Sequence, residues 1–267
     1  MRLLALAAWL ASAASAAAQL PVARLTSVFP PGGQRGHAVE ISIAGADLDS
    51  VDRLLFSHPD ISAQPKLREP GEFETGPQPV ANQFEVKIGA DVPPGAYEVR
   101  AVGKYGVSNP RAFLVGASVE LLEKEPNENF ETAQEVPLDS VVNGRSNRGS
   151  DLDFYRFTAK AGQRVLIECR ARPLDSRLDA ALAVYDSSGR ELAREYDGSL
   201  HDTLVDFTVP ADGSYTVKLH DFIYGGGDEY AYRLSLSTQP RVDFVFPPAG
   251  LPGSKSLYRI YGRNLPG

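Results

Sequence analysis

Two short acidic clusters are the part of this chain whose side chains could do chemistry. The first surrounds Pro126, and the second opens a run of alternating apolar residues that begins at Phe154. Carboxylate and amide oxygens gathered in this way are the ligands that a hard cation, above all Ca²⁺, prefers in proteins. A solvated acidic linker, in which Asn127 caps a short turn, is the competing interpretation. The clusters consist of Glu123, Glu125, Asn127, Glu128, Asp151 and Asp153.

The residue types that commonly carry catalysis form no recognised motif in this chain. None of its four histidines lies in the His-Glu-x-x-His pattern of zinc proteases, and no Gly-x-Ser-x-Gly elbow occurs. The catalytic sets that could be imagined combine Ser199 or Ser214 with His201-Asp202 or His220-Asp221. Geometry rather than composition defines such sets, and we predict that the chain is not an enzyme.

Period-two alternation marks the elements that must position the acidic clusters. Val165, Ile167 and Cys169 alternate with Leu166, Glu168 and Arg170, which is typical of a strand with two different faces. This pattern makes Cys169 a small core residue rather than a nucleophile. Similar short runs separated by Gly-rich turns fill residues 117–238 and predict an antiparallel, jelly-roll-like β-sandwich.

An internal repeat sets the plan of the rest of the chain. The run Val28-Phe29-Pro30-Pro31-Gly32-Gly33 recurs as Val245-Phe246-Pro247-Pro248-Ala249-Gly250, an offset of 217 (245 − 28). Alternating apolar residues follow the first copy, so we predict an immunoglobulin-like sandwich at residues 22–116. The stretch 65–80 is rich in Pro, Gly and Glu and is predicted to be a loop. Residues 239–267 are predicted to be the truncated start of a second such repeat in a protein that continues past Gly267. The overall expectation is an all-β chain of two tandem antiparallel sandwiches.

Two family resemblances agree with this plan. The turn and Gly-x-Asp-Leu corner at Gly45–Leu48 resemble the IPT/TIG family of immunoglobulin-like domains. Residues 117–238 resemble the bacterial pre-peptidase C-terminal domain, a secreted β-sandwich. The matching pieces are Glu125-Pro126-Asn127, Asp151-x-Asp153-x-Tyr155-x-Phe157, Ala161-Gly162, Gly213-x-Tyr215-x-Val217 and Tyr232-x-Leu234.

The second resemblance implies a calcium site, because relatives of that domain bind Ca²⁺ through an acidic linker and an Asp-rich strand start. Glu128 stands where the family pattern often has Asp, and its longer side chain is not expected to reach the ion. The ligands implied for this chain are Glu123, Glu125, Asn127, Asp151 and Asp153.

The composition of the chain indicates where the protein is located and which classes of partner it does not bind. Residues 1–18 have the charged start, apolar core and small-residue end of a secretory signal peptide, and no later segment is apolar enough to span a membrane. We therefore expect a secreted or cell-surface protein. The net charge of −7 argues against nucleic acid as a partner. One cysteine excludes an internal disulfide.

Two interpretations of the function follow. The first is a non-catalytic exported binding, adhesion or spacer module that contacts an extracellular protein or polysaccharide. The alternative is the accessory region of a secreted peptidase or other hydrolase whose catalytic domain lies beyond Gly267. A structural stalk without a ligand is a third possibility.

Overall fold

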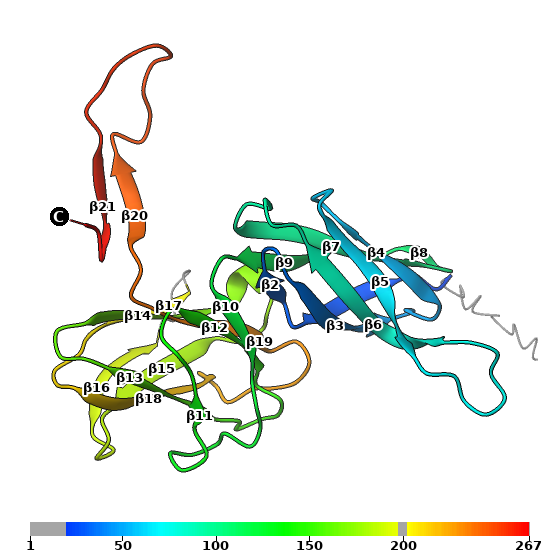
Figure 1. The fold of residues 1–267 in the computed structure, drawn as a ribbon, viewed down its shortest axis with the longest axis horizontal. Coiled ribbons are helices and arrows are strands. Elements are labelled where there is room, and N and C mark those ends of the chain that lie inside the picture. The colour runs from blue at the N-terminus through cyan, green and yellow to red at the C-terminus, as the bar shows by residue number, and fades with distance from the viewer. Residues whose placement is uncertain (1–19, 197–201, 267) are drawn as a thin grey trace, which may run out of the picture.

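The computed structural model describes residues 20–196 and 202–266, and almost all of their regular structure is β-strand (Figure 1). This confirms the predicted all-β fold. The short 3₁₀ turn η1 (Arg172–Leu174) is the one helical element in these two ranges. In the same ranges no helix has the length and apolarity needed to cross a bilayer. The predicted signal peptide, residues 1–18, lies outside the described residues.

The first sandwich contains the strands up to residue 116. They form two sheets with the orders β1-β3-β6-β5 and β2-β9-β7-β4, with β8 paired to β7. The first order is the A-B-E-D order of immunoglobulin sheets, and the second contains their G-F-C order. The strands are β1 (Arg24–Phe29), β2 (Gly32–Gln34), β3 (Ala38–Ala46), β4 (Val51–Phe56), β5 (Ile61–Arg68), β6 (Gln78–Ile88), β7 (Gly95–Gly103), β8 (Gly106–Val107) and β9 (Arg111–Gly116).

The predicted loop 65–80 is shorter than expected. Strand β5 continues to Arg68 and β6 begins at Gln78, so both strands enter the proline-rich stretch. Pro65 pairs with Phe84, and Leu67 pairs with Pro79. Because β5 is the edge strand of its sheet, Pro65 can take part without removing a ladder hydrogen bond that an inner strand would need. The loop predicted from composition is therefore too long at both ends, because β5 extends to Arg68 and β6 begins at Gln78.

The second sandwich packs two five-stranded sheets face to face. One has the order β10-β12-β19-β14-β17 and the other β11-β13-β18-β15-β16. The strands are β10 (Val119–Leu122), β11 (Gln134–Glu135), β12 (Ser140–Arg145), β13 (Asp153–Ala159), β14 (Arg164–Arg170), β15 (Ala180–Tyr185), β16 (Glu191–Tyr196), β17 (Thr203–Thr208), β18 (Gly213–Asp221) and β19 (Ala231–Ser237).

The core between these two sheets is made by the predicted inward rows. Val165, Ile167 and Cys169 of β14 are fully buried against Tyr155 and Leu219 of the other sheet's strands. Burying each aliphatic side chain of this size contributes about 1.5–3 kcal/mol, so this layer is the main source of the domain's stability. Cys169 lies within the core, as its alternation predicted.

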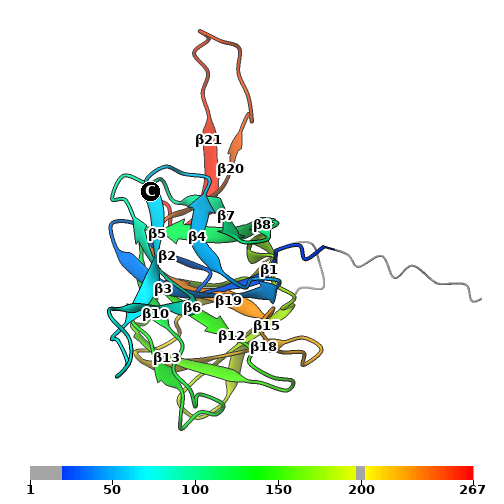
Figure 2. The same ribbon diagram turned by 90° about the vertical axis from the view of Figure 1, so that its right-hand side faces the viewer.

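A two-stranded hairpin, β20 (Arg241–Phe246) and β21 (Arg259–Arg263), projects from the two sandwiches (Figure 1, Figure 2). Its pairing repeats that of β1 with β3 at the offset of the sequence repeat. Arg241 faces Arg263 as Arg24 faces Ala46, and the register shift between Val242 and Phe244 matches that between Leu25 and Ser27. The repeated sequence therefore folds into the same hairpin twice.

The two sandwiches meet at a buried ion pair. Arg233 on β19 donates to the carbonyl of Leu114 on β9 and pairs with Glu120 on β10. Only 6% of the Arg233 side chain and 13% of the Glu120 side chain are exposed. A Cβ on Gly32 would overlap the Arg233 guanidinium, so a residue without a side chain is required there.

Candidate functional site

The two acidic clusters meet at one end of the second sandwich. Glu123 directly follows β10, and its backbone N–H donates to the carbonyl of Asn143 on β12 at 3.0 Å. The N–H of Phe154 donates to the carbonyl of Asn127 at 2.8 Å, which fixes the linker against the start of β13. These backbone bonds bring Glu123 beside Asp153, the first residue of β13.

Three carboxylates form the centre of the site. One carboxylate oxygen from each of Glu123, Glu125 and Asp153 lies within 4.8 Å of the other two. Asp153 is fully buried, Glu123 is partly exposed and Glu125 is exposed. Ionised carboxylates at this separation repel one another, and the repulsion is strongest where burial removes water from between them.

Two buried tyrosines complete a crowded set of oxygens. The Tyr155 hydroxyl lies 2.6 Å from Oε1 of Glu123 and 2.5 Å from the Tyr232 hydroxyl. The Tyr232 hydroxyl also lies 2.7 Å from Oε1 of Glu123 and 2.7 Å from Oδ2 of Asp153. Each of these four contacts needs a hydrogen between its oxygens, but the two tyrosines supply only one each. A proton on a carboxylate would supply a further hydrogen, and a bound cation would offset the negative charge of these oxygens.

The pKa values of these groups are shifted in the direction that favours their neutral, protonated forms. Burial, followed by the charge of Glu123, raises the pKa of Asp153 to about 9. Burial also raises the pKa of Glu125, opposed by the hydrogen bond from Asn147. Burial and the neighbouring carboxylates raise the pKa of both tyrosines well above the usual value, so they act as neutral donors. In the absence of a cation, Asp153 holds a proton at neutral pH.

Asn127 turns its amide toward the same site. Its Nδ2 donates to Oε1 of Glu123 at 3.2 Å, while its Oδ1 is buried and has no hydrogen-bond partner among the described residues. Oδ1 of Asp153 is also buried and unpartnered there. Buried oxygens without partners are costly. The donor set, all oxygen with three carboxylates and one amide, fits Ca²⁺ rather than a soft metal.

Two acidic residues lie outside this donor group. Asp151 is buried, but its Oδ2 accepts from the N–H of Asn147 at 2.6 Å and closes the loop before β13. Glu128 pairs with Arg148 at 2.6 Å. The cluster of three carboxylates thus includes Glu123, Glu125 and Asp153 of the predicted ligands and not Asp151.

The sequence interpretation missed Tyr232 and Asn147 as members of the site. Tyr232 is fully buried on β19, yet its hydroxyl reaches Asp153. Asn147 donates from Nδ2 to Oε1 of Glu125 at 3.0 Å. The motif Tyr232-x-Leu234 could have indicated Tyr232. No pattern in the sequence indicated Asn147.

The residues weighed for catalysis do not come together where the structure describes them. Ser214 and His220 lie on the same strand, β18. Six residues along a strand separate them by roughly 20 Å, far beyond hydrogen-bond reach. Asp221 accepts from the backbone N–H of Asp179 and of Gly225 and holds the following turn. Ser199 and His201 lie outside the described residues.

Residues 151–221 match the family model of the bacterial pre-peptidase C-terminal domain. The chain therefore contains a domain of this family, and the resemblance expected for that segment is confirmed. The IPT/TIG assignment stays a prediction.

The chain is also similar to proteins of known description. It is 31% identical over 122 residues to a probable subtilase-type serine protease of Deinococcus radiodurans, an alignment that covers 42% of this chain and 16% of that protein. Among solved structures, the pre-peptidase C-terminal domain of a Bacillus anthracis collagenase is 17% identical, with a TM-score of 0.34, covering 43% of this chain and 99% of that one. A periplasmic inhibitor of g-type lysozyme from Aeromonas hydrophila is 18% identical, with a TM-score of 0.31, covering 44% and 99%. The chain spans about a sixth of the length of the protease that it matches.

Proposed function

We propose that this chain is a non-catalytic accessory region of a secreted peptidase, with a pre-peptidase domain that binds calcium. The observation that carries the accessory role is the 122-residue alignment with a probable subtilase-type serine protease, together with the family match at residues 151–221. The separation of Ser214 from His220 on β18 adds to it, because that pair cannot act as nucleophile and base.

The accessory role is tested by fusing the chain to the catalytic domain of a subtilisin-type protease. An accessory region acts by holding a polymeric substrate, so kcat/KM on a denatured protein should rise several-fold while kcat/KM on a short chromogenic peptide stays unchanged. A fusion that carries only a Gly/Ser linker is the control. Equal effects on both substrates, or hydrolysis by the chain alone, would contradict the proposal.

The calcium proposal is supported by the crowded oxygens around Asp153. Four short oxygen contacts share two tyrosine hydrogens, and two buried oxygens have no partner among the described residues. A dication supplies the missing positive charge and pins Glu123 and Glu125 of the linker onto the sandwich. The ion would be held by Glu123, Glu125, Asn127 and Asp153.

Calcium is tested by thermal unfolding of the metal-depleted chain with and without added Ca²⁺. Binding to the folded state alone adds about 2.7 kcal/mol of stability when the free ion is at one hundred times its Kd. The variant Glu125→Gln should lose most of this effect, whereas Glu131→Gln in the neighbouring exposed turn should keep it. An unchanged melting temperature in the parent chain would remove the metal from the proposal.

A spacer or adhesion array is the second candidate function. The observation that favours it is the repeat of the β1–β3 hairpin as β20–β21 in the same register. Repeated modules around a pre-peptidase domain suit a chain that spaces or attaches other domains. The fusion experiment separates the two functions, because a spacer raises activity no more than the Gly/Ser linker does.

A further inference from the structure

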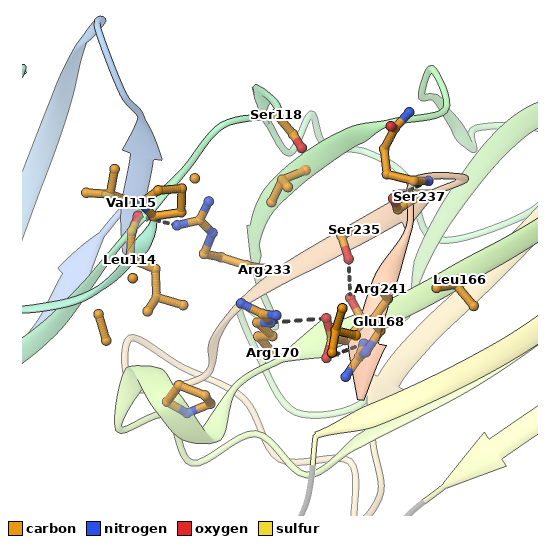
Figure 3. Close-up of a pocket in the computed structure, with 18 of the residues that line it drawn as sticks. Leu114, Val115, Ser118, Leu166, Glu168, Arg170, Arg233, Ser235, Ser237 and Arg241 are labelled. Atoms are coloured by element: carbon orange, nitrogen blue, oxygen red, sulfur yellow. Dashed lines mark hydrogen bonds and ion pairs between the residues drawn. The ribbon is translucent and has the colours of Figure 1, made fainter. Parts of the chain in front are cut away.

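The junction between the three parts of the chain encloses a cavity of about 590 Å³ (Figure 3). Its lining includes Leu114 and Gly116 of β9, Glu168 and Arg170 of β14, and Arg241 of β20. This size lies within the range of small-ligand sites, which occur preferentially where domains meet. The cavity belongs neither to the carboxylate site nor to either core.

The lining of the cavity is rich in arginine. It holds Arg170, Arg233 and Arg241 but a single carboxylate, that of Glu168. The whole chain has a net charge of −7. A concentration of guanidinium groups inside an acidic protein marks a place that attracts anions.

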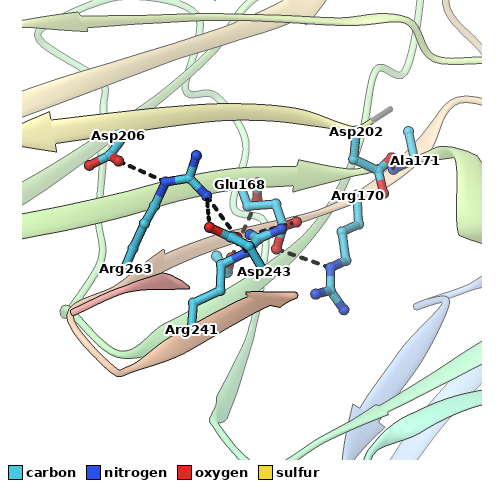
Figure 4. A network of polar contacts seen from close by, with 9 residues as sticks. Glu168, Arg170, Ala171, Asp202, Asp206, Arg241, Asp243 and Arg263 are labelled. Atoms are coloured by element: carbon cyan, nitrogen blue, oxygen red, sulfur yellow. Dashed lines mark hydrogen bonds and ion pairs between the residues drawn. The ribbon is translucent and has the colours of Figure 1, made fainter. Parts of the chain in front are cut away.

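Two arginines of the cavity, Arg170 and Arg241, belong to a network of ion pairs (Figure 4). The third, Arg233, is paired with Glu120. Glu168 accepts from Arg170 at 3.1 Å and pairs with Arg241 at 2.9 Å. The network continues through Asp243, Arg263 and Asp206 to Arg164. In these ion pairs, four guanidinium groups share three carboxylates. The carboxylate of Asp202 lies in the same network, where it accepts from the backbone N–H of Ala171.

Arg170 is the end of that network that faces the cavity. Its Nε is bonded to Glu168, and within residues 20–196 and 202–266 its two terminal nitrogens have no carboxylate partner. Half of its side chain is exposed, 52%. The nearby charge of Arg170 also contributes to lowering the pKa of Arg233, after the larger effect of burial. An anion between the two would relieve that repulsion.

We propose that this cavity binds a carboxylate side chain of an acidic peptide, with the guanidinium of Arg170 as the recognising group. A guanidinium and a carboxylate form paired charge-assisted hydrogen bonds, which suits an Asp or Glu side chain. Pro94, Leu114 and Pro240 provide apolar walls, and Ser237 lies at the rim. These features fit a short extended peptide better than a free inorganic ion. The inference deepens the proposed accessory role by naming acidic polypeptides as the substrates that the region holds.

The test is fluorescence anisotropy with a labelled hexaglutamate peptide, and hexaglutamine and hexalysine as comparisons. The parent chain should bind hexaglutamate, and Arg170→Gln should weaken binding by about tenfold or more, as expected for the loss of a charge-assisted pair. Arg190→Gln, which removes a more exposed arginine at the β15–β16 turn, should bind like the parent. Arg170→Lys keeps the charge without the planar fork and should bind with intermediate affinity.

Three results would overturn the inference: no binding of hexaglutamate, equal binding of hexaglutamate and hexaglutamine, or equal weakening by Arg170→Gln and Arg190→Gln. A thermal melt shows whether each variant remains folded. The peptide assay uses the chain alone, so its failure is distinct from failure of the protease fusion. If the fusion still favours polymeric substrates while hexaglutamate does not bind, only the acidic specificity is lost.

Discussion

The hydroxyl of Tyr232 lies 2.7 Å from Oδ2 of Asp153, although 79 residues separate them and they stand on opposite sheets of the second sandwich. This hydrogen bond lowers the pKa of Asp153 against the larger opposite effect of burial. The tyrosine therefore favours the charged carboxylate that a cation would need. The chemistry of the candidate site depends in this way on a residue that belongs to the hydrophobic core.

The variant Tyr232→Phe should destabilise the domain and weaken Ca²⁺ binding at pH 7. Removing the hydroxyl leaves a buried carboxylate oxygen without its donor, which costs about 1–3 kcal/mol. Urea unfolding measures the stability and calorimetry measures the affinity. Tyr185→Phe is the control, because its hydroxyl contacts the exposed Glu191 at 3.2 Å and should matter little to either quantity. Equal losses in both variants would show that the Tyr232 hydroxyl has no special role.

The stability of the metal-depleted chain should fall as pH rises toward 9. Folded Asp153 keeps its proton up to a pKa of about 9, whereas in the unfolded chain the carboxyl ionises near 3.8. Between these values the folded state binds more protons than the unfolded state, so stability decreases with rising pH. The negative charges of Glu123, Asp151 and Glu125 also raise the pKa of Asp153.

Added Ca²⁺ should offset that loss, so the rise in melting temperature that it causes should be larger at pH 8 than at pH 5. Differential scanning fluorimetry of metal-depleted protein across this range measures the effect. Asp153→Asn mimics the protonated side chain, and we expect it to be more stable than the parent at pH 8 without metal and to respond little to Ca²⁺. A calcium shift that is the same at every pH would refute the coupling.

Gly144→Ala should disturb the site by displacing the side chain of Tyr232. Gly144 pairs with Tyr232 across β12 and β19, and an added Cβ would lie 2.4 Å from the tyrosine hydroxyl. The ring is held by buried hydrogen bonds and cannot move aside cheaply, so we expect a loss of about 1–3 kcal/mol. Gly213→Ala is the matched control, because a Cβ there meets nothing within 4 Å. Chemical denaturation of both variants distinguishes local crowding from a general cost of replacing a strand glycine.

Breaking the pair between Glu120 and Arg233 should destabilise the junction of the two sandwiches. Burial raises the pKa of Glu120 and lowers that of Arg233, and in each case the charge of the partner opposes the shift. Glu120→Leu leaves the guanidinium unpaired and should cost about 3–5 kcal/mol. The double variant Glu120→Leu/Arg233→Met should recover much of that loss.

The control for that experiment is an exposed pair of the same type. Glu135, whose side chain is 68% exposed, pairs with Arg156 at 3.2 Å. Glu135→Gln should change the free energy of unfolding by less than about 1 kcal/mol. If Glu120→Leu costs no more than Glu135→Gln, the buried pair does not hold the junction.

Alternation along single strands determined much of what was predicted. The inward row of Val165, Ile167 and Cys169 is buried as expected, and the all-β fold followed from many such rows. A period of two is a local property, since each residue's face depends only on its position along the strand. The repeated motif likewise predicted the start of a second copy, and β20 pairs with β21 in the register of β1 with β3.

Only the tertiary structure decided which polar groups share a site. Strand order and register place Tyr232 beside Asp153, and backbone contacts turn Asp151 away toward Asn147. The cavity at Arg170 needs three parts of the chain to meet, and Pro65 could join β5 because that strand lies at an edge. The physical reason is that sequence alternation fixes which way a side chain points within its own strand, whereas its neighbours come from strands that are distant in sequence.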